Sequence, residues 1–104
     1  MGKIVLLEDN PGLTEEHYWD IVGKTGHAHD LPDGCHVHIA GMSPDGHLRV
    51  ITVWDDRETM ETFHKEVLHQ ERKEHLKEDV KRQIWELENL VVTDRGEHVA
   101  QPRA

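Results

Sequence analysis

The chain has 104 residues, of which 36% are hydrophobic, and its 21 Asp and Glu against 12 Lys and Arg give a formal net charge of −9. This length suits one domain with a modest core, and the acidic balance argues against nucleic acid, whose phosphates it would repel. No apolar run approaches the roughly 18 residues of a membrane span, and nothing resembles a signal peptide. We therefore expect a single cytoplasmic domain.

The first elements predicted along the chain are a strand and a helix. Residues 3–8 form a β-rich run, which the Asp-Asn-Pro-Gly sequence at 9–12 ends. Thr14 has the chemistry of an N-cap, because acidic residues follow it and apolar residues then recur at helical spacing. We expect a strand ending near Asp9 and a helix over about 15–24.

Two further strands, over 35–42 and 47–54, are joined by the turn sequence Ser-Pro-Asp-Gly. In both strands, apolar residues occur at odd and at even positions, which point to opposite faces of a sheet. Both faces of this hairpin therefore need to be covered. One short chain can cover only one face, which predicts a partner. The expected division of the first of these strands puts Cys35, Val37 and Ile39 on one face and His36, His38 and Ala40 on the other.

The rest of the chain predicts a second helix, an ambiguous segment and a tail. An acidic cap at 55–56 precedes apolar residues at helical spacing through 68, and a second period over 76–87 suggests a further short helix, with 70–82 as its charged face. Residues 84–92 fit either a continued helix or a strand, and their β-branched end favours the strand. The polar residues 94–104 are expected to form a tail.

The resulting order β-α-β-β-α-β is that of a ferredoxin-like α+β domain, here over residues 1–93. Both helices then cover one face of a four-stranded antiparallel sheet, and the other face stays bare. Burial of each apolar side chain there would contribute about 1.5–3 kcal/mol. We expect two copies to dimerise face to face into an α+β barrel.

The residues also resemble a known superfamily. Pro-Gly-Leu-Thr at 11–14 with Tyr18 behind it, Gly-Cys-His-Val-His-Ile-Ala-Gly at 34–41, and Val-Ile-Thr-Val-Trp-Asp at 50–55 with Phe63 behind it are similar to the dimeric α+β barrel superfamily. Within it, they look most like small antibiotic-biosynthesis-monooxygenase-like proteins, over about residues 3–92. The resemblance implies a homodimer and a cofactor-independent oxygenase or cyclase, although haem-degrading enzymes and proteins of unknown role share this fold.

Chemistry is expected in a pocket between the sheet and the helices. A histidine lining it could act as a general acid or base near neutral pH, as oxygenation or cyclisation of an aromatic or polyketide-like substrate requires. We expect no bound cofactor and no metal. The catalytic candidates are His38 and His64, and the substrate-binding candidates are Tyr18, Trp19, Trp54, Phe63, Asn10 and His36.

Two alternatives remain open. The same aromatic residues could simply form the core of a non-catalytic dimeric protein that binds a ligand or serves an accessory role. Alternatively, the histidines could hold Zn²⁺ or Cu²⁺ in a metal-dependent enzyme, although His-x-His spacing is a weak signal. His47 looks exposed. The possible metal ligands are His27, His29, His36, His38 and His64, with Asp30 and Asp33.

Overall fold

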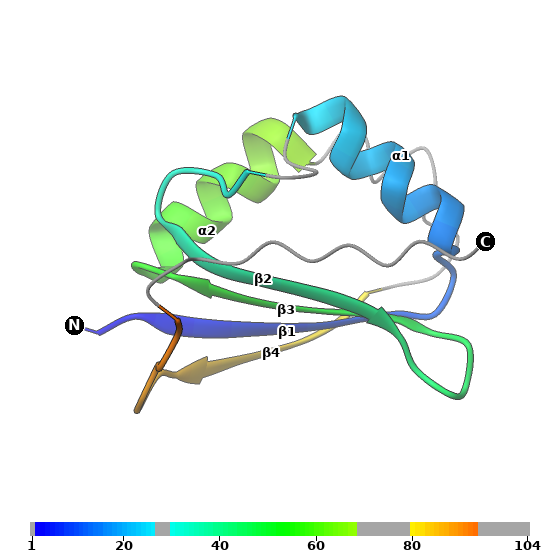
Figure 1. Ribbon diagram of the computed structural model, residues 1–104. Helices are drawn as coiled ribbons and strands as arrows, with labels where there is room; N and C mark the ends of the chain where they lie inside the picture. The colour runs from blue at the N-terminus through cyan, green and yellow to red at the C-terminus, as the bar shows by residue number, and fades with distance from the viewer. Residues whose placement is uncertain (1, 27–29, 69–79, 94–104) are drawn as a thin grey trace.

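A computed structural model of the protein describes residues 2–26, 30–68 and 80–93. These residues form four strands, two α-helices and a π-helical turn, η1, that continues the second helix (Figure 1). The predicted tail over 94–104 lies outside the described residues. The elements are β1 (Ile4–Asn10), α1 (Glu15–Thr25), β2 (Cys35–Met42), β3 (Leu48–Trp54), α2 (Arg57–Phe63), η1 (His64–Leu68) and β4 (Lys81–Glu86).

The four strands form one antiparallel sheet in the order β2-β3-β1-β4. Both helices lie on the same side of this sheet (Figure 1). The predicted ferredoxin-like α+β fold is thereby confirmed, with β1 and β3 as the central strands. The sheet therefore has one face under the helices, which we call the helix face, and an opposite face, which we call the outer face.

Both helices begin where the sequence predicts. The Thr14 side chain accepts a hydrogen bond from the His17 backbone, the His17 ring accepts one from the Thr14 backbone, and Gly26 ends α1 in the left-handed conformation. The Asp56 carboxylate caps α2 by accepting a hydrogen bond from the Thr59 backbone over 2.8 Å. These caps place the two helices at fixed points along the sheet.

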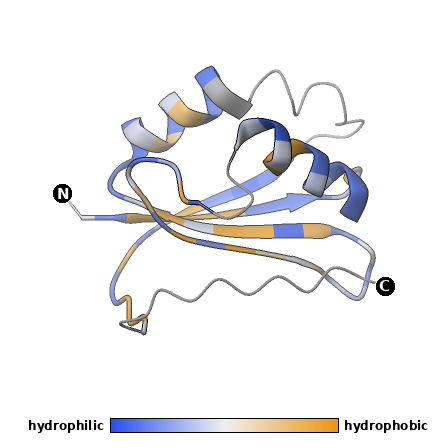
Figure 2. Cartoon of the chain, turned by 45° about the horizontal axis from the view of Figure 1, so that its top comes forward, coloured by the Kyte–Doolittle hydropathy of each residue, from blue (hydrophilic) through white to orange (hydrophobic). Residues whose placement is uncertain are grey.

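The core between sheet and helices has two parts, and Figure 2 shows hydrophobic residues along the strands and on the helices that contribute to it. One part lies under α2 and the other under α1. The first contains Leu6, Cys35, Trp54 and Met60, with Ile4, Phe63 and Ile84 packed against it. The second contains Leu13, Ile21, Leu48 and Val50, with Tyr18, Ala40 and Met42 packed against it.

A β-bulge changes the division of β2 between its two faces. The pairing register with β3 shifts between Cys35 and Val37, so that Cys35 lies opposite Trp54 and Val37 lies opposite Val53. The extra residue, His36, interrupts the alternation. The expectation that Cys35 shares a face with Val37 and Ile39 is wrong, because Cys35 belongs to the core under the helices.

The segment around residue 82, which was predicted to be helical, forms the last strand of the sheet. Residues 81–86 form β4, and the strand choice for 84–92 is confirmed only through Glu86. The helix expected over 76–87 is wrong for 81–86, because pairing with β1 decides their conformation. Val80 and Leu87 are not helical either, and residues 76–79 lie outside the described residues.

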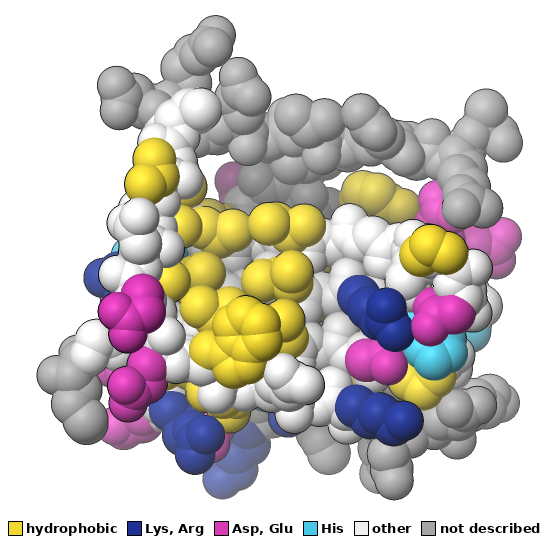
Figure 3. All heavy atoms as spheres, turned by 90° about the horizontal axis from the view of Figure 1, so that it is seen from below, with side chains coloured by type: hydrophobic (Ala, Val, Ile, Leu, Met, Phe, Trp, Pro, Cys, Tyr) yellow, Lys and Arg dark blue, Asp and Glu magenta, His cyan; other side chains and the backbone are white. Residues whose placement is uncertain are grey.

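The outer face of the sheet is apolar in its middle and charged at both ends, as the space-filling view of that side illustrates (Figure 3). Register places two apolar rows across the strands. Beyond them, Arg49, Asp9 and Lys81 form a charged row at one end, and Lys3 with Asp55 forms an ion pair at the other. The apolar rows are Val37, Val53, Val5 and Trp85, and then Ile39, Ile51 and Leu7.

Candidate functional site

The Tyr18 hydroxyl lies 2.6 Å from Nε2 of His38, and this contact joins α1 to β2 on the helix face. The two rings are stacked, with centroids 5.9 Å apart and planes 27° apart. Trp19 meets Tyr18 edge to face, with centroids 5.3 Å apart. Three of the residues that the sequence singled out are therefore brought together at this point.

The surroundings of this pair keep both groups uncharged near neutral pH. Burial of its ring lowers the pKa of His38 below 6.5, and the negative charge of Glu8 opposes this effect. Although His38 retains exposed surface on the edge strand β2, its ring lies against Tyr18. Burial likewise raises the pKa of the Tyr18 phenol. A neutral imidazole can give or take a proton, which suits acid–base chemistry.

Three buried polar side chains, Glu8, Asn10 and Thr52, belong to the sheet beneath the helices. Thr52 lies opposite His38 in the register of β2 and β3. Glu8 accepts a hydrogen bond from Nε of Arg82 over 3.1 Å. Burial of polar groups costs free energy unless they find partners, and each of these three side chains has a hydrogen bond.

Glu8, Thr52 and Arg82 are part of this region although the sequence did not mark them as candidates. Glu8 was read as the end of a strand and Arg82 as part of a solvated helix. The signal that could have found Glu8 is its parity with Leu6, which places both on one face of a strand. Arg82 gave no such signal, because its conformation depends on pairing with a distant strand.

A second group of candidates lies under α2. Trp54 is 1% exposed and packs with Phe63 and His64 at ring-centroid distances of 5.4 and 6.1 Å. The Trp54 indole Nε1 donates a hydrogen bond over 2.8 Å to the hydroxyl of Thr52, which faces His38 across the strands. Thr52 therefore links this aromatic group to the Tyr18–His38 pair.

The two remaining candidates, Asn10 and His36, lie at opposite ends of the sheet. Asn10 is buried at the end of β1, and its amide donates to the Leu48 carbonyl over 3.3 Å. His36 lies at the bulge, with Nε2 2.6 Å from the Asp55 carboxylate. This hydrogen bond is the main reason why the pKa of Asp55 is lowered.

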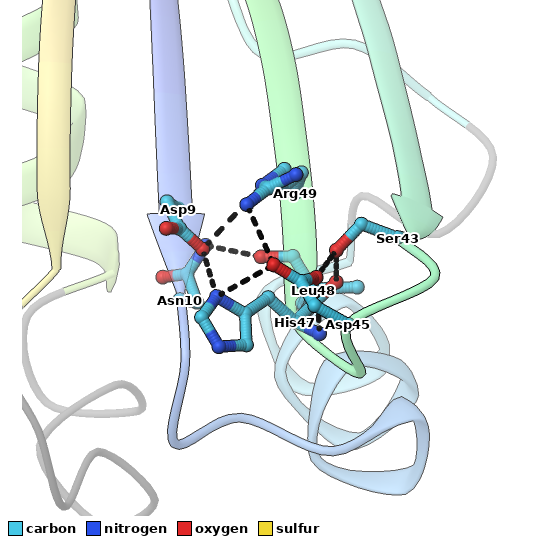
Figure 4. A network of polar contacts seen from close by, with 7 residues as sticks. All are labelled: Asp9, Asn10, Ser43, Asp45, His47, Leu48 and Arg49. Carbon is cyan, nitrogen blue, oxygen red and sulfur yellow. Dashed lines mark hydrogen bonds and ion pairs between the residues drawn. The ribbon is translucent and has the colours of Figure 1, made fainter.

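A polar network connects the β2–β3 turn to the end of β1 (Figure 4). Nδ1 of His47 lies 2.9 Å from the Asp9 carboxylate, and Arg49 bridges Asp9 and Asp45 at 3.6 and 3.1 Å. The Ser43 hydroxyl donates to Asp45, and this hydrogen bond is the main reason why the pKa of Asp45 is lowered. The expectation that His47 is exposed is wrong, because it is partly buried against Asp9.

The described residues provide neither a grouped set of metal ligands nor a membrane-spanning helix. Within residues 2–26, 30–68 and 80–93, no three His, Cys, Asp or Glu side chains are grouped so that they could hold a metal ion. His27 and His29 lie outside those ranges. Among the described helices, none has the length and apolar character needed to cross a membrane.

These elements give the chain a ferredoxin-like α+β fold that several solved structures share, as the resemblance in the sequence implied. Its fold matches that of Rv0793 from Mycobacterium tuberculosis, with a TM-score of 0.68 and 12% identity over 88% of this chain and all of that one. No family model matches the chain, and no curated protein shows a significant match.

Two other similar structures are described as candidate antibiotic biosynthesis monooxygenases. The protein from Caulobacter crescentus has a TM-score of 0.64 and 11% identity, over 85% of this chain and 92% of that one. The protein from Deinococcus radiodurans has a TM-score of 0.60 and 19% identity, over 88% of this chain and 97% of that one. At these identities, the likeness establishes the fold.

Proposed function

We propose that this protein is a small-molecule enzyme that oxygenates or cyclises an aromatic or polyketide-like substrate, between sheet and helices, without a bound cofactor. The observation that carries the proposal is the contact of 2.6 Å between Tyr18 and His38. Uncharged acid–base groups meet there beside a sheet face that holds buried polar side chains. Two similar structures described as candidate monooxygenases support the same chemistry.

In this proposal, His38 transfers the proton. The N–H of a neutral imidazole can donate its proton toward the oxygen of a carbonyl on an aromatic ring, and the neighbouring methylene group then becomes acidic enough to lose its proton to water. In an oxygenation, the carbanion then reacts with O₂, one oxygen atom becomes a carbonyl and the other leaves as water, so the substrate supplies all the electrons. In a cyclisation, the same carbanion attacks a second carbonyl. Trp19 and His64 border the bound molecule.

The test uses anthrone, which is flat and carries such a methylene group. We expect turnover with O₂ to anthraquinone, and we expect His38→Ala to lower kcat by about 10²- to 10⁴-fold, while a ligand-induced rise in Tm persists. His17→Gln, which changes another histidine on the sheet-flanking helix α1, is the control. Full turnover by His38→Ala would show that His38 has no such role.

A non-catalytic binding role is the second candidate, and the burial of Trp54 favours it. With 1% exposure, Trp54 belongs to the core with Leu6 and Met60, as an aromatic residue of structural function would. This candidate is the right one if anthrone or a similar flat aromatic molecule stabilises the wild-type protein but is not converted.

We also propose that the protein acts as a homodimer joined through the outer face of the sheet. Ile39, Ile51 and Trp85 are 56%, 36% and 53% exposed there, although they stand in apolar rows. A patch of this kind, bordered by charges at both ends, has the apolar centre and polar rim of a protein interface. A second copy presents the same surface and fits the isologous contact that is usual for dimers.

A further inference from the structure

The two nitrogens of the His38 ring differ in what they contact. Nε2 meets the Tyr18 hydroxyl at 2.6 Å. Within the part of the chain that the structure describes, Nδ1 has no hydrogen-bond partner, and His38 is exposed on the edge strand β2. Nδ1 is therefore the ring nitrogen that an incoming molecule can reach.

The contact with Tyr18 determines which nitrogen carries the proton. In a neutral pair, either the phenol donates to Nε2 or Nε2–H donates to the phenol oxygen. In the second arrangement, the phenol proton would need another acceptor, and among the described residues the Tyr18 hydroxyl meets only His38. The first arrangement satisfies the phenol proton and Nε2, and it leaves the imidazole proton on Nδ1, where an incoming molecule can accept it, because the bond at one ring nitrogen sets the state of the other.

We propose that Tyr18 is a positioning residue that keeps the proton of His38 on Nδ1, so that the site binds a flat, uncharged molecule through a hydrogen-bond acceptor oxygen such as a ketone. The identity of the ligand rests on the function proposed above, whereas the tautomer does not. Two features favour an uncharged ligand. The net charge of −9 would repel an anion, and the nearby Glu8 carboxylate, which could attract a cation, is already paired with Arg82.

The tautomer is measured without a ligand, by ¹⁵N chemical shifts of the histidine rings in the whole protein. The chain has 10 His, and the signal of His38 is identified by its loss in His38→Gln. We expect the Nδ1–H form in the wild-type protein. Tyr18→Phe keeps the ring and its stacking but removes the hydroxyl, so this variant is expected to lose the preference for Nδ1–H. A merely structural role for Tyr18 would leave the tautomer unchanged.

The ligand class is measured with xanthone and xanthene, which share one ring system and differ by the ketone oxygen. One neutral hydrogen bond predicts that xanthone binds about fivefold more tightly to the wild-type protein in equilibrium dialysis. His38→Ala is expected to abolish this preference, and Tyr18→Phe to reduce it.

Three outcomes decide the matter. An Nε2–H form in the wild-type protein, or the same tautomer in Tyr18→Phe, would overturn the positioning role of Tyr18. Equal affinity for xanthone and xanthene would overturn the acceptor-oxygen assignment. Failure of both molecules to bind, with the Nδ1–H form present, would contradict the proposed function while supporting the positioning role.

Discussion

Arg82 on β4 donates from Nε to the buried carboxylate of Glu8 on β1 over 3.1 Å, across a separation of 74 residues in the chain. Glu8 is 8% exposed, whereas the Arg82 side chain is 42% exposed. The half-exposed Arg82 guanidinium on the edge strand β4 therefore provides a partner for the buried Glu8 carboxylate. The same hydrogen bond connects β4 to β1.

Arg82→Met removes this bond while the carboxylate stays buried, and should lower the free energy of unfolding by about 1–3 kcal/mol. The double variant Glu8→Gln/Arg82→Met should recover part of the loss, because the charge is then gone. Urea denaturation with a double-mutant cycle measures both effects. A cycle with no coupling between the two positions would show that the bond contributes nothing to stability.

The outer face should govern assembly. Ile39→Lys places a charge among the apolar side chains of this face, and we expect it to convert the proposed dimer into a monomer, as measured by sedimentation equilibrium at micromolar concentration. Leu31→Lys is the matched control, because Leu31 is 47% exposed but lies in the connection between α1 and β2, outside the strands of the sheet. A wild-type protein that is already monomeric would refute the proposed interface.

The pKa of His38 makes stability depend on pH. Because burial lowers this pKa in the native state, the unfolded chain binds more protons than the native protein between the lowered pKa and 6.5. The free energy of unfolding should therefore rise with pH through this window. Above pH 6.5, the contribution of His38 to stability should have reached its full value. His38→Gln should fall less in stability between pH 7 and pH 5 than the wild type. An NMR titration midpoint for His38 at or above 6.5 would contradict this explanation.

Two glycines with left-handed backbones should respond differently to alanine. Gly34 and Gly46 have φ values of +83° and +85°, but a Cβ at Gly34 would overlap the Thr59 side chain, whereas at Gly46 it would meet open space. Gly46→Ala should cost only the backbone penalty of about 1–2 kcal/mol, and Gly34→Ala about 1–3 kcal/mol more from overpacking. Chemical denaturation compares them, and equal losses would rule out the clash.

The single cysteine should be unreactive in the folded protein. Burial raises the pKa of Cys35 from its ordinary value of 9.0 to about 11. Since the thiolate is the reactive form, its alkylation by iodoacetamide at pH 8 should be about a hundredfold slower than in the unfolded chain. The rate in guanidinium chloride provides the reference, and similar rates in both states would show that the thiol is accessible.

Local signals in the sequence were sufficient for the order of elements and for the caps at Thr14 and Asp56. Alternation and helical spacing act over a few residues, so they can be read from the sequence alone. The bulge at His36 could not be read in this way, because two residues there oppose one on the neighbouring strand. Because the bulge was not foreseen, Cys35 was predicted on the wrong face of β2.

The candidate site was predicted in part, for a similar reason. Tyr18 and His38 were identified by residue type and do meet, but nothing in the sequence specified that the hydroxyl would lie at Nε2. Residue 82 was assigned to a helix from its charged neighbours. Its strand conformation arises from pairing with β1, a long-range interaction that overrides local propensity.

The bulge at His36 also decides where the only sulfhydryl of the chain lies. With unbroken alternation, Cys35 would stand beside Val37 and Ile39, where two copies in contact could become covalently joined on oxidation. The inserted residue turns it inward, against Leu6 and Trp54. In the proposed dimer, association of the two copies would therefore not depend on the redox state of the surroundings.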